Sequence, residues 1–330
     1  MPVRYQASVS VIFLFCALLT FAGCGDDGVK PDSSGGAAQE ADVIVLTDSR
    51  GQAITLDGPP KRIAALTSFA VEILMAMDTA PVARFPDPDL YPPEAASIPE
   101  ITKLGRGTTH RLDIEELIAA DPDLVILHKV YEGVADNVQQ AVGVPVMVLN
   151  ITSVDDLRDK AELFAQLAGD PTAADSVLGD LDQTLGWLAT NAPKDKPKTV
   201  SLLGMGGGEY FCHRGNHFMG SLLDAAGADN IAADREAHSR YKSLSPIDLE
   251  KLIAEDPEVV FLIPYGDADY DAVVAEFKAD PAVRSLKAVR DGRVYMLPDT
   301  IYTSQPGPRT GEALRTLFGH LYPDAEAPNW

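Results

Sequence analysis

The sequence predicts an α/β protein with two Rossmann-like lobes, a long rigid helix that joins them, and a ligand cleft between the lobes. Two observations lead to this prediction: short buried-strand patterns alternate with helical patterns, and one helix–turn–strand unit occurs twice. The chain has 330 residues, of which 46% are hydrophobic and 23% are charged. This is ordinary globular composition, and the length suffices for two cores.

The internal repeat is the more specific of the two observations. Residues 113–127 read DIEELIAADPDLVIL, and residues 248–262 read DLEKLIAEDPEVVFL, so that nine of fifteen positions are identical. A shared helix, Asp-Pro turn and strand is most simply explained by two related α/β lobes that face one another. The ligand site is then expected between them, at the carboxyl ends of the strands.

The first lobe begins with a predicted hairpin, in which residues 43–46 and 52–56 alternate around Ser49-Arg50-Gly51. A buried strand is predicted at 62–66, a helix cap at Thr67-Ser68, and a helix over 71–77. Two further short apolar runs follow, and the sequence predicts buried strands at 124–127 and 146–149.

The middle of the chain, residues 155–189, is helical in pattern, with a break at Gly169-Asp170-Pro171. Over 171–189 the apolar residues recur at three- and four-residue spacing, which predicts one helix long enough to connect two lobes. The second lobe follows, with strands predicted at 199–203, 259–263 and 293–297 and a closing helix at 312–321.

The N-terminus has the pattern of an export signal. Arg4 precedes an uncharged apolar run at 9–21, and Phe21-Ala22-Gly23-Cys24 resembles the lipobox at which bacterial lipoproteins are cleaved and diacylated. The alternative is an ordinary signal peptide with a chance cysteine. The expected division is a signal peptide at 1–23, lipidated Cys24 with a flexible tether at 24–42, an N-terminal lobe at 43–153, a helical linker at 154–192 and a C-terminal lobe at 193–330.

The charge and the cysteine content argue against three features: a nucleic-acid partner, a disulfide and a cysteine nucleophile. The net charge of −22 argues against a nucleic-acid partner. Of Cys16, Cys24 and Cys212, the first leaves with the signal and the second carries lipid, so no intramolecular disulfide is expected. Cys212 lies in a strand-like run beside Phe211, which favours a small buried apolar residue over a nucleophile.

Several motifs in a fixed order resemble those of a known family. They are the export signal with its lipobox, PKRIAAL at 60–66 followed by Glu72-Ile73-Leu74, the Tyr91-Pro92-Pro93 segment, and both copies of the repeat. Together they resemble the substrate-binding lipoproteins of ABC importers for ferric siderophores, haem or cobalamin, which are class III periplasmic binding proteins. The resemblance extends from about Val43 to Leu321.

This resemblance implies a binding protein that has no enzymatic activity and no catalytic cofactor. The implied partners are an ABC permease dimer with its ATPase subunits, a bulky metal chelate, and the membrane through the lipid anchor. The protein is expected to be an exported monomer facing the periplasm or the cell exterior. Whether the ligand is a ferric siderophore, cobalamin or haem stays open.

Candidate ligand contacts follow from their position beyond strand ends or before the repeat helices. Tyr and Arg can stack on a chelate and bond to its polar edge. The candidates are Thr67, Ser68, Arg106, Thr109, His110, His128, Lys129, Tyr131, Gly206 to Gly208, Tyr241, Lys242, Tyr265 and Tyr302. The resemblance implies ligand contacts for Thr109, His128, Tyr131 and Tyr241. It also implies that Glu115 and Glu250, the same position in the two repeats, dock onto the permease.

Other chemistries are alternatives. His213 and His217, with His238 as a third ligand, could hold a metal and would suit a metal-storage protein, but Gly215 makes a helix between them doubtful and favours structural or solvated histidines. Gly204 to Gly208 lack both the dinucleotide spacing and the Lys of a phosphate loop, which favours close backbone approach to ligand. An exported hydrolase would need a Gly-x-Ser-x-Gly elbow, which the sequence lacks.

Overall fold

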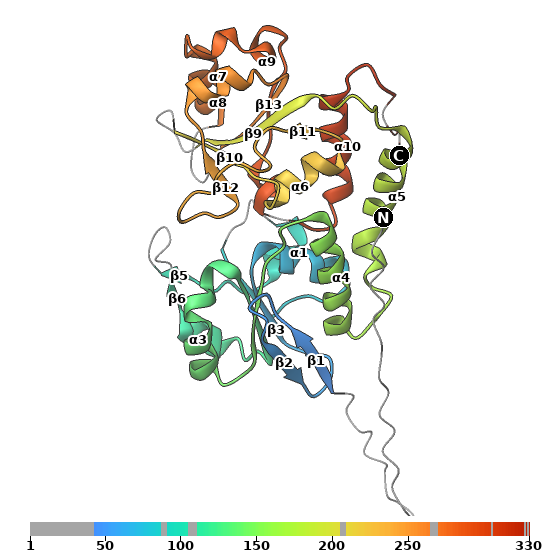
Figure 1. Ribbon diagram of the computed structural model, residues 1–330. Coiled ribbons are helices and arrows are strands. Elements are labelled where there is room, and N and C mark those ends of the chain that lie inside the picture. Colours follow the sequence, from blue (N-terminus) through green and yellow to red (C-terminus); the bar gives the residue numbers. More distant parts are fainter. Residues whose placement is uncertain are drawn as a thin grey trace, which may run out of the picture. The chain divides into compact units, whose positions relative to one another are not determined.

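The structure is a computed structural model that describes residues 43–86, 91–104, 111–204, 209–264, 270–304, 306–326, 328 and 330. The described residues belong to one compact unit. Figure 1 shows its two larger sheets, one in each half of the sequence. Among these residues, no helix combines the length and the apolarity needed to cross a bilayer.

The N-terminal half contains one parallel sheet with the strand order β4-β3-β7-β8. Its strands are β3 (Ile63–Leu66), β4 (Ala83–Arg84), β7 (Leu124–His128) and β8 (Val146–Leu149). Every residue of β3 and β8 is buried, as expected for strands that are covered on both faces. Two small antiparallel pairs accompany the sheet, β1 (Ile44–Thr47) with β2 (Ala53–Leu56) and β5 (Lys103–Leu104) with β6 (Arg111–Leu112).

The helices of this half follow the strands in the alternation that the sequence predicts. They are α1 (Ser68–Ala76), α2 (Ile114–Ala119) and α3 (Ala135–Val142), with 3-10 turns η2 (Pro93–Ser97) and η4 (Lys129–Val134). Asp113 caps α2, since its carboxylate accepts from the backbone N–H groups of Glu115 and Glu116.

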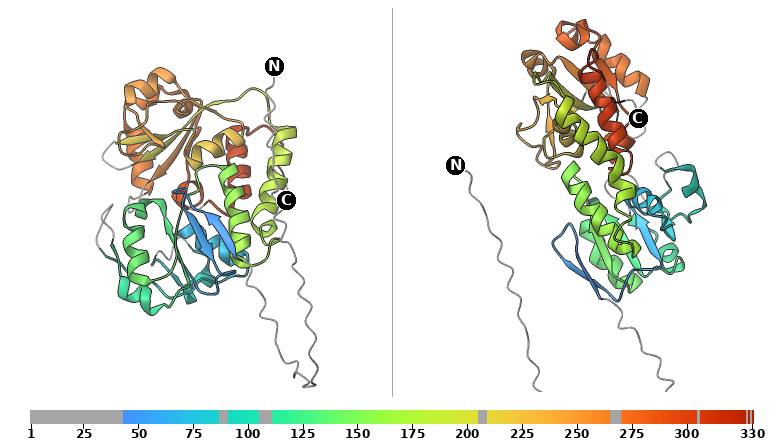
Figure 2. Two further views of the ribbon diagram at one scale, coloured as in Figure 1. Left: turned by 60° about the horizontal axis from the view of Figure 1, so that its bottom comes forward. Right: turned by 90° about the vertical axis from the view of Figure 1, so that its right-hand side faces the viewer.

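The predicted long helical region consists of α4 (Val154–Ala168) and α5 (Asp175–Asn191), and it is broken where expected, at left-handed Gly169. The helix α5 contacts α1 and α4 as well as α10 (Thr310–Leu321), and Figure 2 shows α4, α5 and α10 side by side. Arg315 of α10 donates to Asp180 and Thr184 of α5 at 2.6 and 2.7 Å. The helix therefore contacts elements from both halves of the sequence.

The C-terminal sheet departs from a purely parallel arrangement. Its order is β12-β10-β9-β13-β14, with β11 pairing β9, and β10 and β12 run antiparallel to their neighbours. The strands are β9 (Lys198–Gly204), β10 (Tyr210–His213), β11 (Asp229–Asn230), β12 (Leu244–Pro246), β13 (Val259–Pro264) and β14 (Val294–Met296). The expectation of a Rossmann-like lobe holds for β9, β13 and β14 and is too simple for the edge formed by β10 and β12.

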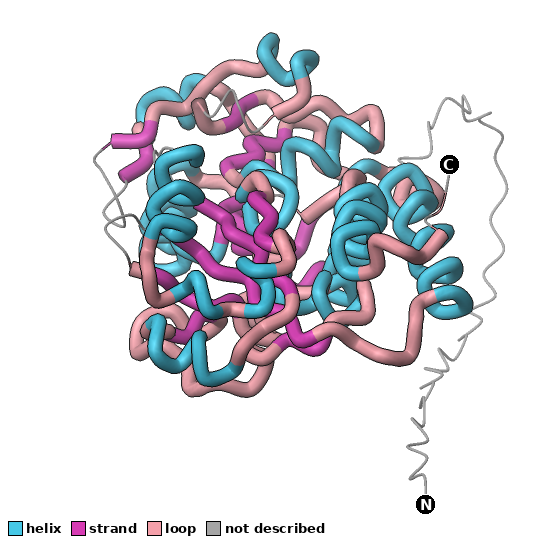
Figure 3. Tube along the Cα trace, turned by 90° about the horizontal axis from the view of Figure 1, so that it is seen from above, coloured by secondary structure: helices cyan, strands magenta, loops and turns pink. Residues whose placement is uncertain are grey.

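Helices flank these strands, and Figure 3 shows strands lying between helices. They are α6 (Phe218–Ala225), α7 (Leu249–Glu255), α8 (Tyr270–Ala279), α9 (Lys287–Arg290), the turn η5 (Val283–Ser285) and a π-helical segment η6 (Thr300–Ser304). Gly220 of α6 is required by packing, because a Cβ there would collide with the backbone carbonyl of Arg214.

Three groups of buried side chains form the core. Two groups each cover one face of one sheet, the face opposite to the third group, and we call them the outer groups. The outer group of the N-terminal sheet includes Leu66 and Leu127, and that of the C-terminal sheet includes Val200 and Leu262. The third group combines residues of both halves, including Phe69 and Phe218. We call this third group the shared core. Cys212 is fully buried in the outer group of the C-terminal sheet, and burial raises the pKa of its thiol to about 12, which confirms the apolar interpretation.

Candidate ligand-binding site

The carboxyl ends of β3, β7 and β8 bring together four polar residues of the N-terminal half. Thr67 and Ser68 follow β3, His128 ends β7, and Asn150 follows β8. Since these strands are parallel neighbours, the four residues share one edge of the sheet. Thr67, Ser68 and His128 were predicted from their position after strands. The same rule applies to Asn150, which the sequence analysis missed.

His128 is held firmly at this edge. Its Nδ1 accepts a hydrogen bond from the backbone N–H of Val130 at 3.2 Å, and its ring meets Phe69 edge-on at 6.2 Å. Burial lowers the pKa of His128 to about 4, against a smaller opposite effect of its hydrogen bond with the Asn150 side chain. The ring is therefore neutral at physiological pH.

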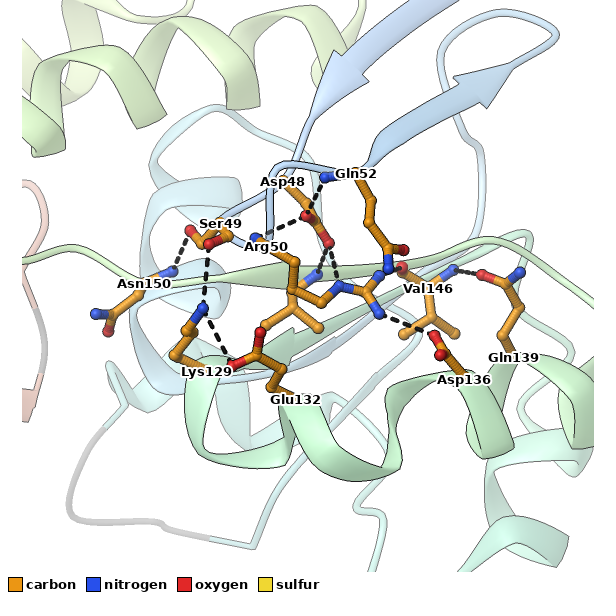
Figure 4. A network of polar contacts seen from close by, with 11 residues as sticks. Asp48, Ser49, Arg50, Gln52, Lys129, Glu132, Asp136, Gln139, Val146 and Asn150 are labelled. Atoms are coloured by element: carbon orange, nitrogen blue, oxygen red, sulfur yellow. Dashed lines mark hydrogen bonds and ion pairs between the residues drawn. The ribbon is translucent and has the colours of Figure 1, made fainter. Parts of the chain in front are cut away.

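Lys129, by contrast, turns toward the N-terminal hairpin (Figure 4). Its Nζ donates to the backbone carbonyl of Ser49 at 3.1 Å and pairs with Glu132 at 3.1 Å. Tyr131 is 7% exposed and packs against Phe85, with ring centroids 5.7 Å apart, in the outer core group. His128, the last residue of β7, contacts Phe69 of the shared core, whereas Tyr131 belongs to the outer core group.

A second cluster lies in the C-terminal half, on β10 and on the segment that precedes β12. The rings of His238 and Tyr241 stack at 5.3 Å with an interplanar angle of 18°, and Phe211 meets His238 edge-on at 5.3 Å. The guanidinium of Arg240 lies 5.6 Å from the centre of the Tyr241 ring. Tyr241 remains 40% exposed. We call Phe211, His238, Arg240 and Tyr241 the aromatic platform.

The platform is fixed to the sheet. The Arg214 side chain donates to the carbonyls of Arg235 and Lys242, each at 2.7 Å, and so holds both ends of the segment. Phe211 lies on β10 and packs against the shared core. The sequence analysis named Tyr241 and Lys242 but missed Phe211 and Arg240. A ring contact between residues 27 positions apart, such as Phe211 and His238, has no signal in local spacing.

His213 and His217 also come together, without forming a helix. His213 ends β10 and His217 is the N-cap of α6, with ring centroids 4.4 Å apart. His213 Nδ1 lies 2.9 Å from Ser201 Oγ, whereas its Nε2 is buried without a hydrogen-bond partner. Burial lowers the pKa of His217 to about 4, and burial together with His217 lowers that of His213 well below its ordinary value. No group of three or more metal-ligating side chains occurs among the described residues.

The other predicted residues are placed as follows. Tyr302 is 3% exposed within the shared core, and burial raises its pKa to about 12. Glu115 and Glu250 are exposed on α2 and α7. The remaining predicted positions lie outside the described residues: Cys24, Arg106, Thr109, His110, Gly206 to Gly208 and Tyr265.

A hollow of about 610 Å³ lies elsewhere, near the start of α4 and along α6. Ser153, Lys194, Lys196 and Asp224 are among its lining residues, and none of the predicted ligand contacts is. We assign the candidate site to the polar sheet edge and the aromatic platform and not to this hollow. Polar and aromatic groups held in a fixed orientation are the groups that recognise a bulky ligand.

Comparison with known proteins identifies relatives along the whole chain. A cobalamin-binding protein of Halobacterium salinarum is 26% identical over 316 residues, which cover 93% of this chain and 82% of the relative. An uncharacterised ABC transporter substrate-binding lipoprotein of Bacillus subtilis, YvrC, is 24% identical over 94% of this chain and 96% of its own length.

A solved structure has the same fold. The ABC-type Fe³⁺-hydroxamate transport system structure from Saccharomonospora viridis matches with a TM-score of 0.68 and 25% identity, over 84% of this chain and 98% of that one. The family model described as "Periplasmic binding protein" matches residues 63–301, which include both sheets and the linker helices. The chain belongs to the periplasmic binding protein family, whose members bind and do not catalyse.

Proposed function

We propose that this protein is the lipid-anchored substrate-binding component of an ABC importer, and that it captures a ferric siderophore and delivers it to the permease. Cobalamin and haem are the alternative ligands of the same kind. The division of the chain into signal, tether, two lobes and linker belongs to this proposal. So do attachment through Cys24 and a monomer that faces the periplasm or the cell exterior.

The duplicated helix is the observation that carries the proposal. In both copies an aspartate caps the helix, Asp113 on α2 and Asp248 on α7, and the next-but-one residue is an exposed glutamate. The side chains at the next position of each helix have partners within the chain. Glu116 accepts from the backbone N–H of Thr102 at 2.6 Å, and Lys251 pairs with Asp248 at 3.3 Å. Glu115 and Glu250 therefore remain for an external partner.

An exposed carboxylate at the same repeat position in each lobe suits a partner with two equivalent basic sites, such as a permease dimer. Ligand capture is supported by the aromatic platform on one sheet and by the Thr67, Ser68 and His128 edge on the other. The printed names of the cobalamin-binding relative and of the hydroxamate-transport structure agree with a metal chelate as the cargo. The alternative of a metal-storage protein gains no support from the described residues, where no group of three or more metal-ligating side chains occurs.

The test is uptake in the host. Cells that lack this chain should lose uptake of one chelate among iron-labelled siderophores, haem and cobalamin, and the intact chain should restore it. A chain with Cys24→Ala serves as an anchoring control. Unchanged uptake of every chelate would contradict the proposal.

A further inference from the structure

The strand β8 lies at the edge of its sheet, and its outer backbone groups bond to the turn of the N-terminal hairpin (Figure 4). We call residues 48–52 the hairpin turn. The backbone N–H of Val148 donates to Asp48 Oδ2 at 3.1 Å, and the carbonyl of Val148 accepts from the backbone N–H of Ser49 at 2.8 Å. The hairpin turn therefore covers the open side of β8, in the place that a further strand would take.

Two bonds connect the hairpin turn to the ends of β7 and β8. The backbone N–H of Asn150, which follows β8, donates to Ser49 Oγ at 3.0 Å. The Nζ of Lys129, which follows β7, donates to the backbone carbonyl of Ser49 at 3.1 Å. These partners lie 101 and 80 positions away from Ser49 in the sequence. A single residue of the hairpin turn therefore connects the carboxyl ends of two neighbouring parallel strands.

Asn150 also contacts His128, the last residue of β7. The Nδ1 of His128 accepts from the backbone N–H of Val130 at 3.2 Å, so the proton of the neutral ring resides on Nε2. The hydrogen bond between this ring and the Asn150 side chain is then donated from Nε2. The orientation of the His128 ring therefore depends on the position of Asn150, and the position of Asn150 depends on Ser49.

The hairpin turn holds Ser49 in a fixed position. The Asp48 side chain is fully buried, and its Oδ1 accepts from the backbone N–H groups of Arg50 and Gln52 at 2.8 and 3.1 Å. Its Oδ2 accepts from Arg50 Nε at 2.6 Å. Gly51 has a φ of +80°, a left-handed conformation that glycine adopts without strain. Because these contacts fix the backbone around it, Ser49 presents its hydroxyl and its carbonyl in one orientation.

From these contacts we infer that the hairpin turn is a positioning element of the ligand-binding site, and that Ser49 is its positioning residue. Ser49 places Asn150, and through Asn150 it orients His128 on the polar sheet edge, without contacting the cargo itself. Lys129, which the sequence analysis predicted as a ligand contact, serves the same placement through its bond to Ser49. The inference rests on the proposed function, since it assigns the hairpin turn a role at the same site.

The first experiment compares serine variants of the purified protein. A ferric trihydroxamate, ferric citrate, haem and cyanocobalamin are titrated by calorimetry, and the variants are tested on each probe that the unmodified protein binds. Ser49→Ala removes the acceptor of the Asn150 N–H and should weaken binding about tenfold, whereas Ser49→Thr keeps the hydroxyl and should bind within about threefold of the unmodified protein.

Ser153→Ala is the matched control. Ser153 Oγ also accepts from a backbone N–H, that of Asp156 in α4, at 3.0 Å. Its removal should lower the urea midpoint of unfolding about as much as Ser49→Ala does, because a bond of the same kind is lost. Ser153→Ala should nevertheless bind each probe within about twofold of the unmodified protein. An equal loss of affinity in both variants would reduce the effect of Ser49→Ala to a loss of stability and would overturn the inference.

A double-variant cycle separates an indirect role of Ser49 from a direct one. If Ser49 acts through the Asn150 side chain, Asn150→Ala removes the group that Ser49 positions. The variant with both Ser49→Ala and Asn150→Ala should then bind each probe within about twofold of Asn150→Ala alone. Losses that multiply in the double variant would mean that Ser49 acts independently of Asn150, and the inference would be wrong.

A further measurement needs no ligand. In imidazole nitrogen NMR spectra at neutral pH, we expect one tautomer of His128, with its proton on Nε2 and slow exchange of that proton with water. Ser49→Ala should accelerate this exchange at least about fivefold, whereas Ser153→Ala should leave it unchanged. Equal exchange in Ser49→Ala and in the unmodified protein would contradict a positioning role.

A failure of the inference is distinguishable from a failure of the proposed function. If no probe binds to the unmodified protein, the proposed function is wrong, and the role of the hairpin turn at a ligand site is wrong with it. If a probe binds, and Ser49→Ala binds it as tightly as the unmodified protein does, the inference alone is wrong.

Discussion

Arg309 donates from Nε to Oε1 of Glu72 at 2.6 Å, and this ion pair joins residues that lie 237 positions apart. Glu72 lies on α1 and is 8% exposed, and Arg309 is the residue before α10. The pair therefore connects a helix of the first half to a helix of the second. It accompanies the bond from the backbone N–H of Val154 to Ser221 Oγ at 2.9 Å, which connects α4 to α6.

Removing the guanidinium should destabilise the protein more than removing the charge of Glu72. Arg309→Met leaves a buried carboxylate without this partner and should lower the free energy of unfolding by about 1–3 kcal/mol, whereas Glu72→Gln should cost less. Urea unfolding measures both. Arg158→Met, which breaks an exposed pair with Asp182, is the control and should cost under about 1 kcal/mol. Equal losses in Arg309→Met and the control would contradict a role for the pair.

The Arg309→Met defect should depend on pH. Burial raises the pKa of Glu72 above its ordinary 4.5, and Arg309 opposes this rise. A carboxyl with a raised pKa binds its proton more tightly in the folded state, so its contribution to stability falls as pH rises from the ordinary value through the raised one. Without Arg309 the rise is larger. The loss in free energy of unfolding caused by Arg309→Met should therefore be small near pH 4 and reach its full size near pH 8. A loss that is constant across this range would refute the account.

Asp48 anchors the hairpin to the parallel sheet (Figure 4). Although burial acts in the opposite direction, hydrogen bonds from the Arg50 side chain and from the backbone N–H groups of Val148 and Gln52 hold the pKa of Asp48 below its ordinary 3.8. The stability that Asp48 provides is thus present above that value and is lost as pH falls through the lowered pKa.

Asp48→Asn should therefore lower the free energy of unfolding by about 1–3 kcal/mol at neutral pH and flatten its fall below about pH 4. Denaturant titration across this pH range measures both effects. Asp136→Asn removes an exposed partner of the same arginine and should cost less than about 1 kcal/mol. If the free energy of unfolding of Asp48→Asn falls below about pH 4 as steeply as that of the unmodified protein, other carboxylates cause this fall.

Tyr131→Ala should affect stability, whereas Tyr241→Ala should affect chelate binding. Tyr131 is buried against Phe85, so its truncation should cost about 3 kcal/mol of stability. Tyr241 is exposed on the aromatic platform, so its truncation should weaken chelate binding by about 1–3 kcal/mol at an unchanged unfolding midpoint. Calorimetry and thermal unfolding on both variants separate the effects. A binding defect in Tyr131→Ala alone would place the site elsewhere.

Glu115→Arg combined with Glu250→Arg should abolish transport while folding and chelate binding remain intact. Exposed charges at a docking surface govern encounter with a partner more than the affinity for a ligand held elsewhere. Uptake with the protein's own permease is the measurement. Glu94→Arg with Glu312→Arg is the control with the same charge change, since both are exposed and one lies in each half. Normal uptake by the first double variant at wild-type level would show that these glutamates are only surface charge.

Local patterns were sufficient to predict most of the fold. Buried runs such as Ile63–Leu66 and the cap at Asp113 carry signals within a few residues, because burial on both faces and capping each impose a residue type. The break at Gly169 was predicted for the same reason. The antiparallel β10 and β12 were missed, because Phe211 to His213 shows no period that fixes its direction relative to β9.

The site was predicted less completely. The rule that ligand contacts follow strand ends selected Thr67 and His128, which lie at one edge of the sheet, and their role in binding remains a prediction. It also selected Tyr131 and Tyr302, which are buried, as is Thr67. The aromatic platform depends on contacts such as Phe211 with His238, which form only when β10 and the segment before β12 lie side by side. Pairing of this kind is a tertiary property that no local spacing records.

Native mass spectrometry of the protein purified from its own host tests the central claim most directly. A substrate-binding protein of this kind should carry a single retained ligand per chain, with the mass of an intact metal chelate, and mild acid or excess competing chelate should release it unchanged. A chain that carries several bare metal ions, or that converts an added chelate to a product of different mass, would contradict the account.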